Sequence, residues 1–174
     1  CEGILIDEFK KWATVHSLAG LDHRGSEASA LAMSLVSQGH SAAICNTTVD
    51  GIFLETLSSA GFRTVSLIHE LSIVIADNHL EDHARSIAKN ADKVVFAATQ
   101  VMEPFLEIAP IPEDKTVIRF QGNYKKNVYL DKKEFASQKL RKKMGLPSDA
   151  KIVLGAGYLD HRKGIDLFVQ AGFD

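Results

Sequence analysis

The residues best suited to hold an anion lie near the carboxyl end of the chain, in the segment KIVLGAGYLDHRKG at 151–164. An apolar run there leads into closely spaced glycines, a polar loop and a pair of cations. Glycine lets the backbone approach a ligand closely, and the first N–H groups of the helix expected next carry partial positive charge. This combination predicts a phosphate or diphosphate site, although many such turns only connect a strand to a helix. The predicted diphosphate-binding residues are Gly157, Arg162, Lys163 and Gly164.

A second set of polar residues directly follows two apolar segments that have the character of buried strands. His69 and Glu70 come after one of them, and a histidine in such a place can hold a substrate hydroxyl or exchange a proton near neutral pH. It can equally be a loop histidine that bonds only to backbone. Asn46 and Thr47 come after the other, where they could bind sugar hydroxyls, but ordinary turn chemistry is the favoured interpretation.

These residues can work together only if the fold brings the strand ends to one place. Apolar residues recur at helical spacing in some segments and form short runs in others, so helices alternate with strands. This order predicts the doubly wound α/β architecture, a Rossmann-like parallel sheet with helices on both faces, which binds ligands beyond the carboxyl ends of its strands. Phe9 and Trp12 are expected in the core. The expected helices lie at 4–13, 26–36, 52–60, 78–91 and from Thr99 onward, and the expected strands at 14–18, 41–45, 63–68, 93–96 and 116–120.

The alternation stops at 123–150, which we interpret as a basic linker between two domains. The first domain is residues 1–122, a partial Rossmann-like domain. The second is residues 151–174, which would begin with a strand at 152–154 and continue into a helix from Ile165.

The linker is crowded with lysine. Between Lys125 and Lys143 there are seven lysines and one arginine against two carboxylates, a net charge of +6. Part of this segment, 133–144, has the pattern of a helix. Its charge could draw it to an anionic membrane, at roughly 1 kcal/mol per lysine close to the surface, or it could be a solvated linker helix, which is the favoured interpretation.

Composition excludes several classes of protein. The 174 residues carry a net charge of −2, so nothing global indicates a nucleic-acid partner. Two cysteines are too few for a disulfide framework, which suits a reducing cytoplasm. No apolar run approaches the roughly 20 residues that span a bilayer. His79 and His83 have a metal-compatible spacing but no evident third ligand, so no metal site is predicted.

Four segments, in order, resemble one family of enzymes. They are VSLIHEL, ADKVVFAATQVMEPFL, KTVIRFQGNYKK and KIVLGAGYLDHRKGIDLFVQA, and the resemblance covers about 43–171. The chain is similar to the retaining glycosyltransferases of the GT-B fold, in the glycogen-synthase-like class (family four, group one). The last segment resembles the start of their second domain, where a glycine turn and Lys-Gly open a helix.

The resemblance implies transfer of a sugar from a nucleotide-sugar donor to an acceptor, with retention at the anomeric carbon. It makes His69 the catalytic residue that faces the sugar in the first domain, and it gives Lys163 the donor diphosphate in the second. A cationic contact of this kind stabilises the leaving diphosphate without a metal. The acceptor-side residues would be Asn46, Thr47 and Glu70.

The partners that follow are a nucleotide-sugar donor, as co-substrate, and a glycan or lipid-linked acceptor. Neither a metal nor another cofactor is expected. The expected setting is synthesis of a bacterial surface polysaccharide in the cytoplasm, at the inner face of the membrane if the basic linker contacts it.

The chain also departs from the family. Tyr158 stands where the family usually has arginine after the turn glycine, and Arg162 is the candidate substitute. The family's first glycine-rich loop would precede Cys1, and its paired glutamates would follow Asp174, so an internal fragment is expected that does not turn over by itself. The apolar residues of 151–174 would be exposed if nothing covered them, so we expect this unit to dock on the first domain or on a neighbouring chain, the latter giving a homodimer.

Two other functions stay open at this level. One is a different GT-B enzyme, such as a sugar-nucleotide epimerase or a phosphorylase; an epimerase needs no acceptor. The other is a non-catalytic GT-B-like binding module, an interpretation that Tyr158 keeps open.

Overall fold

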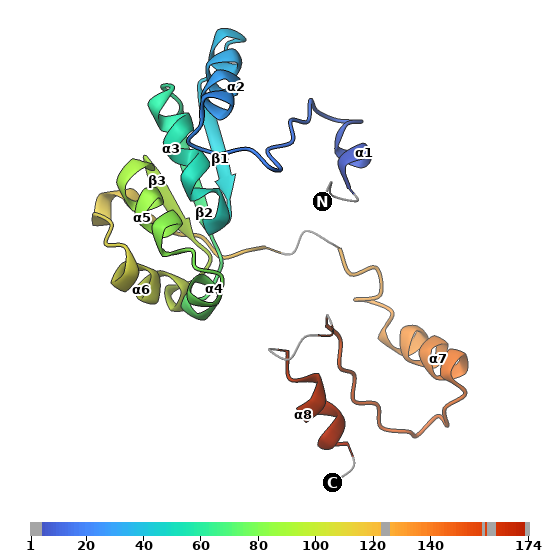
Figure 1. Cartoon of the computed structure of the whole chain (residues 1–174). Coiled ribbons are helices and arrows are strands. Elements are labelled where there is room, and N and C mark those ends of the chain that lie inside the picture. Colours follow the sequence, from blue (N-terminus) through green and yellow to red (C-terminus); the bar gives the residue numbers. More distant parts are fainter. Residues whose placement is uncertain (1–4, 123–125, 158, 160–162, 173–174) are drawn as a thin grey trace. The chain divides into compact units, whose positions relative to one another are not determined.

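The computed structural model describes residues 5–122, 126–157, 159 and 163–172 (Figure 1). The chain divides into two compact units, Cys1–Gly122 and Asn123–Asp174. Of the predicted diphosphate residues, Arg162 lies outside the described residues.

The first unit is built on a four-stranded sheet in which all neighbouring strands are parallel. The order of the strands across the sheet, β1-β2-β3-β4, is also their order along the chain. Apolar and β-branched residues prevail in these strands, as they do in other buried parallel strands. The predicted α/β class with its parallel sheet is therefore confirmed. The strands are β1 (Ala42–Asn46), β2 (Arg63–Ile68), β3 (Lys93–Phe96) and β4 (Thr116–Ile118).

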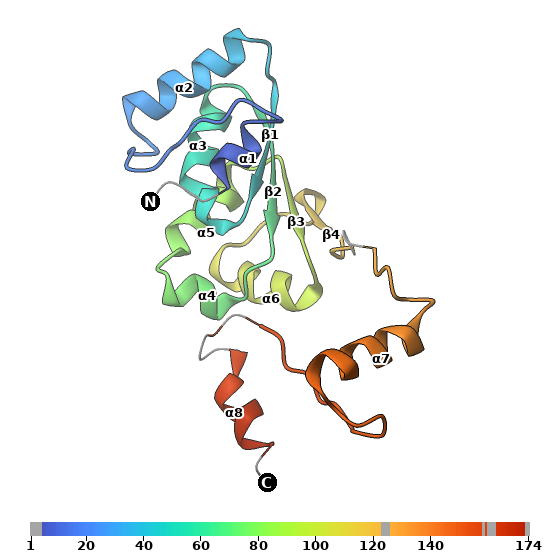
Figure 2. The same ribbon diagram turned by 90° about the vertical axis from the view of Figure 1, so that its right-hand side faces the viewer.

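Helices connect the successive strands. Because each strand lies beside the one before it, right-handed crossovers bring the connecting helices to the same face of the sheet. The helices that connect β1 to β4 therefore cover one face, and not both faces as the alternation of helix and strand predicted. Figure 2 shows α3 and α5 side by side on that face. Burial along β2 agrees, since Thr64, Ser66 and Ile68 are buried whereas Val65 and Leu67 are half-buried. The helical elements of this unit after residue 25 are α2 (Ser26–Ser37), η1 (Thr48–Asp50), α3 (Gly51–Ser59), α4 (Ser72–Asp77), α5 (Glu81–Asn90), α6 (Thr99–Ile108) and η2 (Glu113–Lys115).

The hydrophobic core lies between the sheet and these helices. Phe96 of β3 meets Phe105 of α6 edge to face, with ring centroids 5.4 Å apart. Burial of side chains of this size contributes roughly 1.5–3 kcal/mol each. The apolar face predicted for 78–91 is buried as expected, and its members are Leu80, Ala84, Ile87 and Ala91.

The prediction of one continuous helix over 78–91 is wrong at its start. The helix α5 begins only at Glu81, after a separate helix α4 that ends at Asp77, and His79 between them has a φ of 55°. A residue in the left-handed region cannot continue a right-handed helix, so the chain turns there. Ile75, which the prediction left out, anchors α4 because its side chain is fully buried.

The amino-terminal prediction is also wrong. The helix α1 (Ile6–Phe9) is short, and 14–18 forms no strand. Trp12 is 84% exposed and Phe9 is exposed as well, so neither belongs to the core. Helical spacing of apolar residues predicts an apolar face, but it does not supply the partner that would cover it.

The second unit contains the predicted basic helix as α7 (Lys133–Met144), which ends at Gly145 with a φ of 64°. The short helix α8 (Ile165–Gln170) follows later. The strand predicted at 152–154 does not form, because a strand needs a neighbour to take its hydrogen bonds. Gly155 has a packing role, since a β-carbon there would lie 2.8 Å from the ring of Phe168.

Candidate functional site

The predicted acceptor-side residues come together at the carboxyl ends of β1 and β2. The two strands are parallel, and the register pairs Asn46 with Leu67. One residue further, the Thr47 N–H donates to the Leu67 carbonyl oxygen over 3.0 Å. The loop after β1 therefore lies directly beside His69 and Glu70, as the parallel arrangement predicts.

Glu70 connects these two strand ends. Its Oε2 accepts hydrogen bonds from the backbone N–H of Thr48 at 3.2 Å and from the Thr48 hydroxyl at 3.1 Å. The backbone N–H of His69 donates to the same oxygen at 3.3 Å. Thr48 is fully buried, and the Glu70 side chain is largely buried as well. The loop after β1 is therefore fixed against the end of β2 by hydrogen bonds that are shielded from water.

The His69 imidazole is the accessible member of the group. Its Nε2 lies 3.4 Å from Glu70 Oε1, and the exposed fraction is 36% for the His69 side chain against 12% for Glu70. An imidazole beside a carboxylate can accept or donate one hydrogen bond to a ligand while the carboxylate fixes its proton. The His69 ring is thus partly open to solvent and has a carboxylate beside it.

The ionisation of Glu70 reflects its partners. Burial alone would raise the pKa of Glu70, but the hydrogen bonds that it accepts and the neighbouring His69 outweigh burial. The net result is a lowered pKa. Glu70 is therefore a carboxylate at neutral pH, and it gives this end of the sheet a negative charge.

Thr47 has an unusual backbone conformation, with a φ of 105° and a ψ of 155°. A β-branched residue adopts positive φ only under constraint, at a cost of roughly 1–3 kcal/mol. Two hydrogen bonds hold it: its N–H donates to Leu67, and its hydroxyl accepts the N–H of Val49 at 3.0 Å. The loop that carries Asn46 and Thr47 is thus held in a fixed, strained shape beside His69.

Asp50 belongs to the same end of the sheet, and sequence reasoning missed it. Its Oδ2 accepts the backbone N–H of Asn46 at 3.0 Å. Burial raises the pKa of the Asp50 carboxyl, and the Glu70 charge adds to the rise. The Asn46 hydrogen bond, His23 and His83 act in the opposite direction but do not cancel it.

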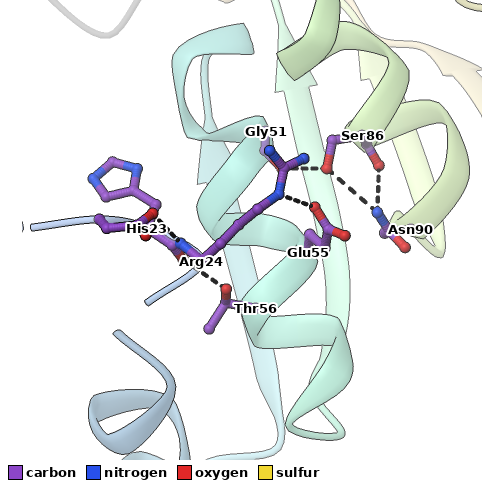
Figure 3. A network of polar contacts seen from close by, with 8 residues as sticks. His23, Arg24, Gly51, Glu55, Thr56, Ser86 and Asn90 are labelled. Atoms are coloured by element: carbon purple, nitrogen blue, oxygen red, sulfur yellow. Dashed lines mark hydrogen bonds and ion pairs between the residues drawn. The ribbon is translucent and has the colours of Figure 1, made fainter. Parts of the chain in front are cut away.

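His23 reaches this region because its loop is tied to α3 (Figure 3). The Thr56 hydroxyl donates to the His23 carbonyl oxygen at 2.6 Å, and Arg24 Nε lies 2.8 Å from Glu55 Oε2. The His23 ring also meets Phe53 edge to face at 5.9 Å. No local sequence pattern predicts this placement, because Glu55 and Thr56 lie about thirty residues further along the chain than the groups they bind.

His83 is placed by the close crossing of α3 and α5. A β-carbon at Gly51 would lie 2.2 Å from the His83 carbonyl oxygen, so only glycine fits there. The Ser86 hydroxyl donates to the Gly51 carbonyl oxygen at 2.8 Å, and Asn90 donates to Ser86 in turn (Figure 3). His83 Nδ1 lies 2.7 Å from the Val49 carbonyl oxygen and must donate to it.

Metal ligands and a reactive thiol are two further features that could bear on the chemistry of this unit. Within the residues that the structure describes, no three or more His, Cys, Asp or Glu residues are grouped to hold a metal. Burial, and to a smaller extent the negative charge of Asp50, raises the pKa of the Cys45 thiol to about 11. Cys45 therefore stays protonated at neutral pH, and thiolate chemistry is not expected of it.

The predicted diphosphate residues lie in the second unit. Gly157 and Lys163 are exposed, and Gly164, with a φ of 60°, directly precedes α8. The Lys163 ammonium is thus open to an anion.

Comparison of the chain with models of known protein families, with curated proteins and with solved structures finds no match. Among the helices formed by the described residues, none has the length and apolar character to cross a bilayer.

Proposed function

We propose that the chain is part of a retaining glycosyltransferase with two Rossmann-like domains. It would transfer a sugar from a nucleotide-sugar donor to a glycan or lipid-linked acceptor. The observation that carries the proposal is the meeting of His69 and Glu70 with the strained Asn46–Thr47 loop at the carboxyl edge of a parallel sheet. The four segments that resemble the GT-B family support the same assignment.

The chemistry of this edge suits a neutral, hydroxyl-rich ligand. The ionised Glu70 disfavours anions, while the imidazole, amide and hydroxyl groups of His69, Asn46 and Thr47 can exchange hydrogen bonds with sugar hydroxyls. In the proposal, this unit holds sugar hydroxyls through His69, and Asn46 and Thr47 position the acceptor.

The diphosphate of the donor is assigned to the second unit. Lys163 supplies a point charge, while Gly157 and Gly164 leave the backbone open to close approach. As the bond to the sugar breaks, negative charge grows on the leaving diphosphate, and a fixed cation stabilises that charge in the transition state.

Binding, rather than turnover, tests the two assignments separately. A panel of methyl glycosides is titrated into the isotope-labelled chain, and the amide resonances of residues 46–50 and 69–70 are followed by NMR. We expect shifts confined to these residues and their loss in His69→Ala. If no glycoside moves these resonances at concentrations of tens of millimolar, the sugar-binding assignment is wrong.

The second assignment is tested with nucleoside diphosphates. We expect Lys163→Ala to weaken their binding by about tenfold, because one charge-assisted contact is lost. Lys151→Ala removes an exposed lysine from the same unit and is the matched control. Equal binding by the wild type and both variants would overturn the role of Lys163.

The proposal includes a peripheral contact of α7 with anionic lipid. None of the residues of α7 is buried, and its lysines lie beside the exposed Phe135, Leu140 and Met144. At low salt, the chain should sediment together with vesicles of phosphatidylserine and phosphatidylcholine. Replacement of Lys139, Lys142 and Lys143 by glutamine should abolish this co-sedimentation. If the variant still sediments with the vesicles, α7 is not the contact.

A further inference from the structure

The two oxygens of the Glu70 carboxylate have different surroundings. Oε2 receives three donors, namely the N–H and hydroxyl of Thr48 and the N–H of His69. Oε1 lies 3.4 Å from His69 Nε2, which is close enough for electrostatic attraction although no hydrogen bond joins the two atoms. Oε2 is therefore occupied by hydrogen bonds from Thr48 and from the His69 backbone, whereas Oε1 faces the His69 imidazole.

This division determines which ring nitrogen of His69 carries the hydrogen. A hydrogen on Nε2 is attracted by the anionic oxygen, whereas a lone pair on Nε2 would be repelled by it. The neutral ring is therefore held as the Nε2–H form. Nδ1 is then left with a lone pair and acts as a hydrogen-bond acceptor.

We infer that Glu70 is a positioning residue that keeps the proton of His69 on Nε2, so that Nδ1 accepts a hydrogen bond from a donor group on the ligand. A sugar hydroxyl satisfies this requirement, whereas a fully ionised phosphate oxygen meets a lone pair and a nearby carboxylate. Glu70 thus makes the histidine selective for hydroxyl groups over anions. That the hydroxyl belongs to a sugar rests on the proposed function; the ring's protonation state does not.

The substitution Glu70→Gln gives a sharp test. The three donors around the position of Oε2 require an oxygen, so the amide oxygen of glutamine must occupy it. The amide NH₂ group then faces His69 Nε2 as a donor and drives the ring hydrogen to Nδ1. We expect the ring ¹⁵N spectrum of His69 at a pH where the ring is neutral to change from the Nε2–H pattern to the Nδ1–H pattern. The ring resonances that disappear in the variant His69→Gln are those of His69.

Two controls separate positioning from a structural role. Glu107→Gln removes an exposed carboxylate from α6 and should leave the His69 pattern unchanged. Protection of the Thr48 N–H from hydrogen exchange should persist in Glu70→Gln, because the amide oxygen still accepts it. An unchanged His69 pattern in Glu70→Gln would overturn the inference. So would a wild-type ring with its hydrogen on Nδ1, a measurement that needs no variant.

The probes methyl glucoside and inorganic phosphate distinguish this inference from the proposed function. We expect the glucoside, but not phosphate, to shift the His69 ring resonances. If the ring pattern inverts in Glu70→Gln but no glucoside effect is seen, positioning by Glu70 stands and the sugar assignment falls. A response to phosphate alone would contradict the selectivity for hydroxyl groups.

Discussion

The hydroxyl of Thr48 donates to Glu70 Oε2 over 3.1 Å, across 22 residues of sequence. This contact joins the loop after β1 to the end of β2, and the Thr48 N–H strengthens it. The polar groups of two strand ends are therefore not independent, since a single carboxylate orients the loop and faces the imidazole of His69.

Removal of the Thr48 hydroxyl should destabilise the first unit. Valine has nearly the same shape as threonine, but it leaves Glu70 Oε2 without one of its donors. We expect Thr48→Val to lower the free energy of unfolding by about 1–3 kcal/mol, because Thr48 is fully buried. Urea denaturation followed by circular dichroism measures the change. Thr14→Val, at an exposed position, is the control, and a loss as small as the control's would contradict the role of this contact.

Glu70 should make stability depend on pH in the acid range. Its folded-state pKa is lowered from the ordinary value of 4.5, so the unfolded chain binds more protons between the two values. Its contribution is present above 4.5 and is lost as the pH falls through the folded-state pKa. The stability difference between wild type and Glu70→Gln should therefore shrink on acidification. A difference that is constant from neutral pH to pH 3 would rule out this linkage, and Glu107→Gln, at an exposed position, is the control.

The contribution of Asp50 to stability should depend on pH in the opposite direction to that of Glu70. Its folded-state pKa is raised from 3.8, so its stabilising contribution is present below 3.8 and is lost as the pH rises through the folded-state pKa. Asp50→Asn keeps an oxygen for the Asn46 N–H and removes the buried charge. We expect the melting temperature of this variant to exceed that of the wild type at neutral pH, with the gain disappearing at low pH. Asp77→Asn, at an exposed position, is the control, and a gain that persists unchanged at low pH would contradict the role of the Asp50 charge.

Much of the sheet and part of the site could be predicted from sequence. Short apolar runs bounded by glycine and polar residues located the strands to within two residues. Because parallel strands place their carboxyl ends at one edge, the proximity of His69 and Glu70 to Asn46 and Thr47 followed from the alternation of helix and strand. These predictions depend on local pattern and on one rule of topology, and both are readable in a single chain.

The remaining features depend on contacts that no local pattern encodes. The approach of His23 to Asp50 needs the loop before α2 to bond to Thr56, and the predicted sequence pattern gives no sign of it. The failed strand at 152–154 and the exposed Trp12 have the converse cause. Apolar residues do recur at both places, but within each unit by itself the described residues supply no surface that buries them.

The strain at Thr47 should reverse the usual order of alanine and glycine. Both substitutions lose the hydroxyl that accepts the Val49 N–H, but only glycine adopts a φ of 105° without a steric penalty. We expect Thr47→Gly to be more stable than Thr47→Ala by about 1 kcal/mol. The control is the exposed helical Ala30, where glycine should be less stable by a similar amount. An alanine variant as stable as the glycine variant at position 47 would show that the loop relaxes at no cost.

The two faces of the sheet should respond differently to the same substitution. Ile44 of β1 is 73% exposed and Ile68 of β2 is 1% exposed, so they differ in burial while sharing residue type and sheet. Ile68→Ala should cost roughly 2–5 kcal/mol, through lost burial and the cavity it leaves. Ile44→Ala should cost less than about 1 kcal/mol, which reflects strand preference alone. If the two losses are equal, the face that carries Ile44 is covered in solution. Sedimentation at several protein concentrations would then separate self-association, which depends on concentration, from cover by the chain itself, which does not.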